Sequence, residues 1–268
     1  MKGRQNSSAL AEAALDMVRD GFVVGLGSGR AATAFVRALG ERVRAGLGVR
    51  CVPTSDATAN LAAELNIPLV SPDDIEGIDV TVDGADEVDP SLDLIKGLGG
   101  ALVREKVVAA ACRRLVILVG AEKLVSALGE HGVLPLEVVP FGLAWCRRRL
   151  AHLGYPAVPR QAAGKLFVTD NGNCILDCKV PVLRNPPAVE EVLRAIPGVV
   201  GTGLFLGMAH TVLVDDQGRI EVRQRPSSMR MPTTAANLHE GGPYGQTASH
   251  SGQPAGRVVL HAGGEGIS

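Results

Sequence analysis

The 268-residue sequence has few aromatic side chains, no long apolar run and no excess of one charge. Aromatic residues make up only 3%, so a stacking platform for single-stranded nucleic acid is not expected. Lys and Arg total 27 against 28 for Asp and Glu, and this balance argues against a general nucleic-acid or anionic-membrane binder. No apolar run approaches the roughly 20 residues that cross a bilayer. We therefore predict neither a nucleic-acid partner nor a membrane.

A targeting signal and a disulfide framework are also missing from the pattern. The first residues, MKGRQNSSAL, contain no apolar core of a signal peptide. The five cysteines are odd in number and scattered along the chain, which favours free thiols in a reducing compartment. The sequence therefore predicts a cytoplasmic protein.

Metal-ligand spacing is absent as well. Cys174 and Cys178 are close in sequence, but the run NCILDCKV predicts a strand. On a strand the two thiols would lie roughly 13 Å apart on one face, which disfavours a shared metal. Since no cluster of His, Cys and carboxylates has ligand spacing, we expect no metal.

What is present, up to about residue 128, is an alternation of strands and helices. Short apolar runs predict strands at 22–26, 50–53, 78–82 and 115–119. Helical spacing of apolar residues predicts helices at 7–18, 31–39, 57–65 and 100–112. This alternation is typical of parallel βαβ units, with helices on both faces of an α/β sheet.

A different order of predicted strands and helices, typical of a small α+β lobe, follows at about 130–200. The elements expected there are strands at 134–139, 165–169 and 174–177 and a helix at 189–195. The run Asp170-Asn171-Gly172-Asn173 is a strong hairpin turn signal. A second hairpin is predicted to join 211–214 to 220–222.

The last 43 residues, 226–268, contain 8 Gly and 4 Pro and few apolar side chains. Three histidines in this segment are spaced about eleven residues apart, without metal-ligand spacing. Such a composition predicts a disordered tail rather than a functional appendage.

Loops rich in glycine or polar residues follow each predicted strand of the first part. Because ligands collect beyond the carboxyl ends of parallel strands, these loops predict one shared site. The loops are GLGSGRAA at 25–32, TSDAT at 54–58, DGADE at 83–87, KGLGG at 96–100 and Glu122-Lys123. The first loop suits a phosphate at a helix N-terminus, although a simple tight turn explains it equally well.

Three carboxylates and two lysines stand in or beside these loops. Asp83 and Asp86 suit hydroxyl binding or proton transfer. The alternatives are a solvated turn for Asp83 and a helix N-cap for Asp86. Glu105 lies in the first turns of the helix that opens at the glycine-rich KGLGG loop, the alternative being an exposed surface carboxylate. Lys96 and Lys123 would give positive charge to an anionic substrate, unless they are ordinary surface lysines.

Taken in order, seven runs resemble ribose-5-phosphate isomerase of the A type over about residues 8–225. They are GLGSGRAATAF, TSDAT, VDGADEVD, KGLGGALVREK, LPLEVVP, DNGNCILD and IPGVVGTGLF. The resemblance implies a Rossmann-like parallel-sheet lobe at 1–129 completed by 200–225, with a smaller α+β lobe inserted at 130–199. It also implies a homodimer or homotetramer that binds a small sugar phosphate and needs no cofactor.

That family interconverts D-ribose 5-phosphate and D-ribulose 5-phosphate through an enediolate, in the non-oxidative branch of the pentose phosphate pathway. On the matching positions, the resemblance implies that Glu105 moves a proton between C2 and C1. Asp83 would assist ring opening and proton traffic at the sugar oxygens, and Lys96 would stabilise the enediolate oxygen. The resemblance also implies two sets of binding residues. The sugar would be bound by Asp86 and by the backbone of Gly84, Ala85, Gly97, Leu98 and Gly99. The phosphate would be bound by Ser28, Gly29, Arg30, Ala31 and Lys123.

The phosphate end departs from the family's pattern. The family often has hydroxyl residues where this chain has Arg30 and Ala31, and some members have a lysine where Ser7 stands. A guanidinium at position 30 could replace the lost hydroxyl bonds with a charged fork.

Two other functions stay open at this point. One is a non-catalytic sugar-phosphate sensor resembling the effector domains of some bacterial repressors. The predicted strand near residue 22 leaves no room for their N-terminal helix-turn-helix, and a sensor need not keep Glu105, Asp83 and Lys96 together. The other is a related enzyme, such as an amino-sugar-phosphate deaminase or an acyl-CoA transferase.

Overall fold

The computed structural model describes residues 2–225, with side chains from residue 9 onward; the tail predicted at 226–268 lies outside these residues. The helices are α1 (Lys2–Leu15), α2 (Gly29–Arg44), α3 (Asp56–Glu64), α4 (Leu102–Ala111), α5 (Leu143–His152) and α6 (Pro186–Arg194), with 3₁₀ turns η1 (Pro72–Asp74), η2 (Ala121–Lys123) and η3 (Pro140–Gly142). None of the helices within 2–225 is long and apolar enough to span a bilayer.

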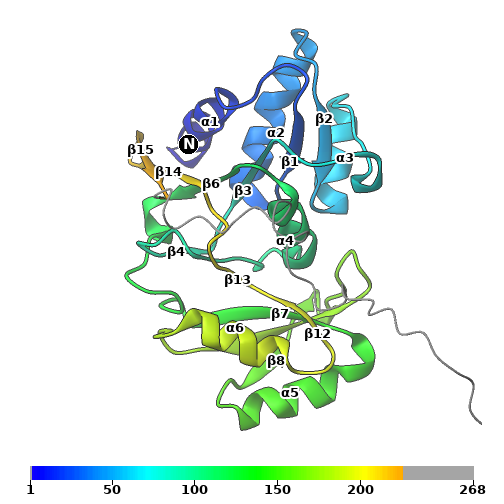
Figure 1. Ribbon diagram of the computed structural model, residues 1–268, viewed down its shortest axis with the longest axis vertical. Coiled ribbons are helices and arrows are strands. Elements are labelled where there is room, and N and C mark those ends of the chain that lie inside the picture. The colour runs from blue at the N-terminus through cyan, green and yellow to red at the C-terminus, as the bar shows by residue number, and fades with distance from the viewer. Residues whose placement is uncertain (1, 226–268) are drawn as a thin grey trace, which may run out of the picture. The chain divides into compact units, whose positions relative to one another are not determined.

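Six strands form the major sheet, in the order β15-β14-β6-β3-β1-β2 (Figure 1). They are β1 (Val23–Leu26), β2 (Arg50–Pro53), β3 (Val80–Gly84), β6 (Leu115–Gly120), β14 (Thr211–Asp216) and β15 (Arg219–Gln224). All neighbours are parallel except β15, which runs antiparallel to β14. The carboxyl ends of five strands therefore lie along one edge, and β1 stands at a switch point between β2 and β3. The predicted α/β fold is confirmed.

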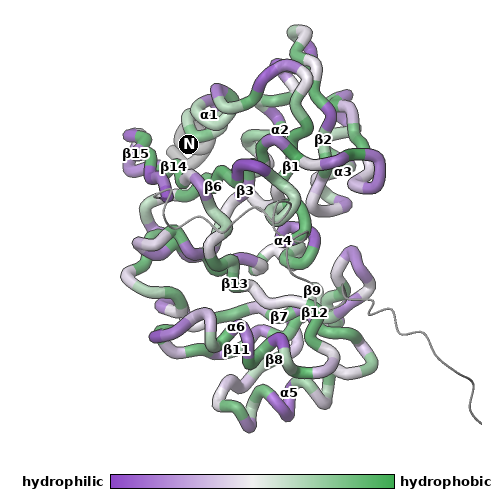
Figure 2. The backbone as a smooth tube through the Cα atoms, in the orientation of Figure 1, coloured by the Kyte–Doolittle hydropathy of each residue, from purple (hydrophilic) through white to green (hydrophobic). Residues whose placement is uncertain are grey.

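Both faces of the major sheet are buried. Along β6, Leu115, Ile117 and Val119 pack with residues of α4, whereas Val116 and Leu118 pack with α1 and α2. Each buried side chain of this size stabilises the fold by about 1.5–3 kcal/mol. The edge strand β15 instead carries several hydrophilic residues (Figure 2), and charged edges discourage pairing with another chain.

A four-stranded antiparallel sheet, in the order β12-β7-β11-β8, forms a second core. Its strands are β7 (Val133–Val138), β8 (Ala157–Pro159), β11 (Cys174–Lys179) and β12 (Val199–Thr202). The helices α5 and α6 contact this sheet (Figure 1). Cys174 and Cys178 are free and buried in this core, as the strand pattern predicts.

Helix α5 was not predicted from the sequence. Its run LAWCRRRLAH buries only Cys146 and Leu150 fully, and charged residues fill the space between them. A three-stranded sheet of β13 (Leu204–Phe205), β5 (Leu94–Ile95) and β4 (Glu87–Val88) was also missed, because two-residue strands leave no periodic pattern.

The strand predicted at 165–169 is wrong in length, and its predicted pairing is confirmed only at one residue. The strand β10 covers Lys165–Leu166 and pairs with β9 (Gln161–Ala162), whereas Val168 forms a single antiparallel bridge with Cys174 of β11. Ala163 and Gly164 between β9 and β10 both have positive φ, which is the geometry of a tight hairpin turn with its own register. The predicted turn at 170–173 is confirmed, with Gly172 N–H donating to the oxygen of Thr169 at 2.8 Å.

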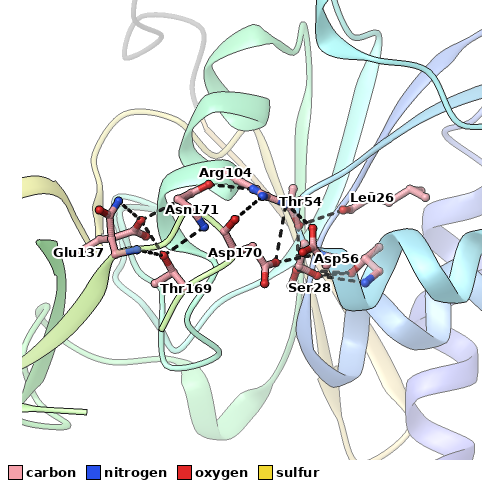
Figure 3. Close-up of polar contacts among 12 residues, drawn as sticks. Leu26, Ser28, Thr54, Asp56, Arg104, Glu137, Thr169, Asp170 and Asn171 are labelled. Carbon is pink, nitrogen blue, oxygen red and sulfur yellow. Dashed lines mark hydrogen bonds and ion pairs between the residues drawn. The ribbon is translucent and has the colours of Figure 1, made fainter. Parts of the chain in front are cut away.

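Arg104 of α4 ties this turn to the major sheet's helices (Figure 3). Its guanidinium donates to Asp56 Oδ1 at 2.7 Å, to Asn171 Oδ1 at 2.9 Å and to the backbone oxygen of Asp170 at 2.7 Å. Asp170 Oδ2 accepts from the N–H of Asp56 at 2.8 Å. Arg104 thereby joins α4, the start of α3 and the turn at 170–173.

Glu137 of β7 holds the same turn from the opposite side (Figure 3). Its side chain is fully buried. Oε1 accepts from Thr169 Oγ1 at 3.1 Å, from Asn171 Nδ2 at 2.9 Å and from Asn173 Nδ2 at 2.9 Å. The turn is therefore fixed by one carboxylate on one side and one guanidinium on the other.

The predicted lobe boundaries, at 129/130 and 199/200, stay predictions. All the described residues belong to one compact unit, although the two large sheets have separate cores. We propose that the second core is an inserted lobe, and limited proteolysis within residues 129–133 would test that boundary.

Replacing Glu137 by leucine should lower the free energy of unfolding by about 2–4 kcal/mol, because three hydrogen bonds to a charged acceptor are lost. Glu137→Gln keeps an amide oxygen and should lose less than the leucine variant. Urea unfolding of both variants measures the difference. A leucine variant as stable as the wild type would contradict this role of Glu137.

Candidate active site

A cavity of about 700 Å³ opens at the carboxyl edge of the major sheet. Its wall includes Ser28 after β1, Gly84 at the end of β3, Lys123 after β6 and Asp216 at the end of β14. The loops that follow separate strands thus meet at one rim, as the sequence predicts for a parallel sheet.

Most of the predicted site residues line this cavity. They are Ser28, Gly29, Arg30, Ala31, Gly84, Ala85, Asp86, Lys96, Gly97, Gly99, Glu105 and Lys123. Two do not: Asp83 is 1% exposed and lies behind Lys96, and the Leu98 side chain is exposed. The backbone of Leu98 still reaches the site, because its N–H donates to Asp86 Oδ2 at 3.0 Å.

The structure adds Leu10 and the segment 215–217 to the cavity wall. The sequence of 215–218 predicts a hairpin turn but gives no sign that the turn lies at the site. The chain returns to the major sheet only after it has formed the four-stranded sheet. No local sequence pattern therefore indicates that β14 pairs with β6, which is what brings 215–217 to the cavity.

Asp83 is fixed by backbone donors at the end of β3. Its Oδ1 accepts from the N–H of Ser28 at 3.1 Å and from that of Gly84 at 2.7 Å. This approach requires glycine at position 27, where a Cβ atom would lie 2.2 Å from Asp83 Oδ1. The glycine of the first loop therefore serves close packing of β1 against the carboxylate.

Lys96 joins two buried carboxylates. Its Nζ lies 3.1 Å from Asp83 Oδ2 and 3.4 Å from Glu105 Oε1, and it donates to the backbone oxygen of Gly84 at 2.5 Å. The ring centroid of Phe205 lies 5.5 Å from Nζ, within the range of a cation–π interaction. The ammonium is therefore held in one place by oxygens and an aromatic face.

Glu105 is buried because it lies on the apolar face of α4. That face carries Leu102, Glu105, Val108 and Ala109, at helical spacing. The alternative of an exposed surface carboxylate is therefore wrong. Glu105 Oε2 has no hydrogen-bond partner among the described residues, which leaves one oxygen free beside the cavity.

Burial raises the pKa of Glu105 to about 8, and the negative charge of Asp83 adds to this rise. Lys96 acts in the opposite direction but does not offset the other two effects. For Lys96 itself, burial lowers the pKa, yet the charges of Asp83 and Glu105 outweigh burial, so its pKa is raised. Lys96 therefore stays an ammonium, while Glu105 exchanges a proton near neutral pH.

Hydroxyl groups gather at the start of α2, where Ser28 is the N-cap. Ser28 Oγ lies 2.8 Å from Thr54 Oγ1 and 2.9 Å from Ser55 Oγ, and Thr54 Oγ1 donates to the Leu26 oxygen at 3.0 Å (Figure 3). Arg30 is exposed at the cavity wall and Lys123 is half-buried there. A helix N-terminus with these neighbours suits an anion.

Comparison with known proteins agrees with this geometry. Residues 50–219 match the family model of ribose 5-phosphate isomerase A (phosphoriboisomerase A). The chain is 50% identical to ribose-5-phosphate isomerase A of Gloeobacter violaceus over 213 residues, which cover 79% of this chain and 93% of that protein. It is 49% identical to the Roseiflexus castenholzii protein of the same name over 224 residues, 82% of this chain and 96% of that protein. The chain belongs to the ribose 5-phosphate isomerase A family.

Solved structures of the ribose 5-phosphate isomerase A family share the fold. The protein from Methanocaldococcus jannaschii superimposes with a TM-score of 0.79 at 37% identity, covering 82% of this chain and 99% of that chain. A D-ribose-5-phosphate isomerase in complex with phospho-erythronic acid has a TM-score of 0.80 at 37% identity, covering 83% and 99%. Family membership decides against the sensor, the deaminase and the acyl-CoA transferase.

The pKa of Glu105 gives a direct prediction. A ¹³C NMR titration of its side-chain carboxyl should have a midpoint of about 8, with the protonated form below it and the carboxylate above it. Asp83→Asn should lower the midpoint because a negative neighbour is removed, and Lys96→Met should raise it because a positive one is removed. A midpoint near the ordinary glutamate value of 4.5, unmoved by either change, would contradict the description of this site.

Proposed function

We propose that this cavity interconverts D-ribose 5-phosphate and D-ribulose 5-phosphate through an enediolate, with Glu105 as the base that moves the carbon-bound proton. The buried Lys96–Glu105 contact, with one Glu105 oxygen unpartnered, is the observation that carries the proposal. The named relatives act as ribose-5-phosphate isomerases, and one solved relative binds phospho-erythronic acid, a phosphorylated sugar acid. Those names support the same substrate class here.

In the forward direction, the Glu105 carboxylate takes the proton from C2 of the open-chain aldose. The electron pair moves through the carbonyl, and O1 gains negative charge in the enediolate. The same carboxyl then returns the proton to C1 while the proton of the O2 hydroxyl passes to O1. C2 thereby becomes the carbonyl carbon, and O1 becomes the C1 hydroxyl. A base with a pKa of about 8 both accepts and releases this proton near neutral pH.

Lys96 is the electrophile of the step. Its ammonium lies on the cavity wall and contacts Glu105, so a sugar oxygen beside the base also lies beside the positive charge. A fixed cation placed where oxygen gains charge is among the largest sources of rate enhancement.

Asp83 lies behind Lys96, away from the cavity surface. We assign it the proton traffic at the sugar oxygens and the assistance of ring opening, acting in relay with the Lys96 ammonium. Asp86 faces the cavity and accepts the Leu98 N–H, and it would bind sugar hydroxyls with its other oxygen.

The phosphate would lie at the start of α2, beside Arg30 and Lys123. The N-terminal N–H groups of the helix and the two cations supply complementary charge. The backbone of Gly29 and Ala31 lines the same part of the wall.

The assembly into a homodimer or homotetramer and the cytoplasmic location stay predictions. Sedimentation equilibrium would test the predicted assembly.

A coupled assay for ribulose 5-phosphate formation tests the proposed function. The wild type should turn over ribose 5-phosphate, with EDTA present, because the proposed step needs only a base and a cation from the chain. Glu105→Gln should lose on the order of 10²–10⁴ in kcat with little change in KM. Glu64→Gln, an exposed glutamate on α3, is the matched control and should keep the wild-type kcat. A Glu105→Gln enzyme within about threefold of the wild type would assign the base to another carboxylate.

A second variant tests the phosphate end. Arg30→Ala should raise KM for ribose 5-phosphate more than it lowers kcat, because a phosphate contact serves substrate and transition state alike. Arg37→Ala, further along α2, is the control and should change neither constant. An unchanged KM for Arg30→Ala would mean that its guanidinium faces solvent.

A further inference from the structure

Arg160, which follows β8 of the four-stranded sheet, reaches across to the glycine-rich loop of the cavity. Its Nη1 donates to the backbone oxygen of Gly97 at 2.8 Å and to that of Leu98 at 2.9 Å. The other edge of its guanidinium pairs with Asp177 of β11, with Nε donating to Oδ2 at 2.9 Å and Nη2 to Oδ1. The Arg160 side chain is only 13% exposed. No part of the sequence pattern indicates this contact, because 62 residues separate Arg160 from Leu98.

The direction of the two carbonyls fixes the direction of two N–H groups. The described chain has no cis peptide bond, and in a trans peptide the N–H points away from the carbonyl of the same unit. With the oxygens of Gly97 and Leu98 turned to Arg160, the N–H groups of Leu98 and Gly99 face the opposite side. That side is the cavity side, since the Leu98 N–H donates to Asp86.

The Gly99 N–H donates to no acceptor within residues 2–225, and Gly99 lines the cavity. A Cβ atom at Gly99 would meet nothing within 4 Å, so the space beside its Cα is open. The loop therefore presents one N–H that holds Asp86 and one that is free for a ligand oxygen.

We propose that Arg160, braced by Asp177, is a positioning residue that aims the N–H groups of Leu98 and Gly99 into the cavity, where the Gly99 N–H binds an oxygen of the sugar as the enediolate forms. This inference rests on the proposed function. It extends the active site to the four-stranded sheet, none of whose described residues lies in the cavity wall.

Arginine is the side chain that this geometry requires. One edge of the planar fork matches a carboxylate, while the remaining nitrogen still donates to two carbonyls. A lysine at this position is a point charge and cannot keep both sets of contacts. The Phe167 ring lies 6.0 Å from the Arg160 guanidinium and packs against the end of the loop, where a Cβ at Gly100 would approach it to 2.4 Å.

Steady-state kinetics of Arg160→Met and Arg160→Lys distinguish a positioning role of Arg160 in catalysis from a role in folding alone. Both variants should lower kcat by on the order of 10²-fold, as expected for misplaced catalytic groups, while KM changes less than about threefold because the phosphate end is untouched. Asp177→Asn should lower kcat in the same direction by a smaller factor.

Arg104→Met is the matched control, because Arg104 likewise donates hydrogen bonds to several parts of the chain but contacts no carbonyl of the glycine-rich loop. It should lower the melting temperature as much as Arg160→Met does and leave kcat within about threefold of the wild type. Equal losses of kcat in the two methionine variants would overturn the positioning role.

The chemical shift of the Gly99 amide proton gives a second test, because a loss of stability alone does not change how this proton responds to a ligand. Adding phospho-erythronic acid to the wild type should shift the Gly99 amide proton, and the Arg160→Met variant should not show this shift. If the wild type fails to isomerise ribose 5-phosphate, the proposed function is wrong. If the wild type isomerises it, and Arg160→Met keeps both wild-type kcat and the Gly99 shift, only the inference about Arg160 is wrong.

Discussion

One ammonium shared by two buried carboxylates is the constraint on which this site depends. Lys96, Asp83 and Glu105 are each less than one-tenth exposed, so water contributes little to the solvation of their charges. A single positive charge does not offset two negative ones at low dielectric, and one carboxyl must take up a proton more readily than usual. The structure selects Glu105 for that role.

The selection follows from unequal surroundings. Asp83 receives two backbone N–H groups and the closer contact to Lys96, and the absence of a side chain at Gly27 leaves room for it. Glu105 stands on an apolar helix face with one oxygen unpartnered. Two carboxylates in one site thereby acquire different tasks, one fixed in place and one free to exchange a proton, which is how enzymes divide acid–base work between like residues. The carboxyl edge of the parallel sheet brings the two together from β3 and α4.

The sequence predicted the parallel α/β fold and most of the cavity wall, because strand ends and glycine loops are local signals. It did not predict that Glu105 is buried, since the same residue in a helix's first turns is usually exposed. The spacing of Leu102, Glu105 and Val108 held that information, as a carboxylate within an apolar stripe. Arg160 and the segment 215–217 were missed because their places depend on how distant parts of the chain pair, and no local pattern records that pairing.

The pH dependence of kcat/KM for ribose 5-phosphate tests the central claim most directly, since that constant reports ionisations of the free enzyme. If the buried Glu105 is the base, kcat/KM should rise with pH through a midpoint of about 8, as the carboxyl loses its proton, and then level off. A profile that is flat from about pH 6 to 9 would contradict the account, because a glutamate of ordinary acidity is already ionised throughout that range.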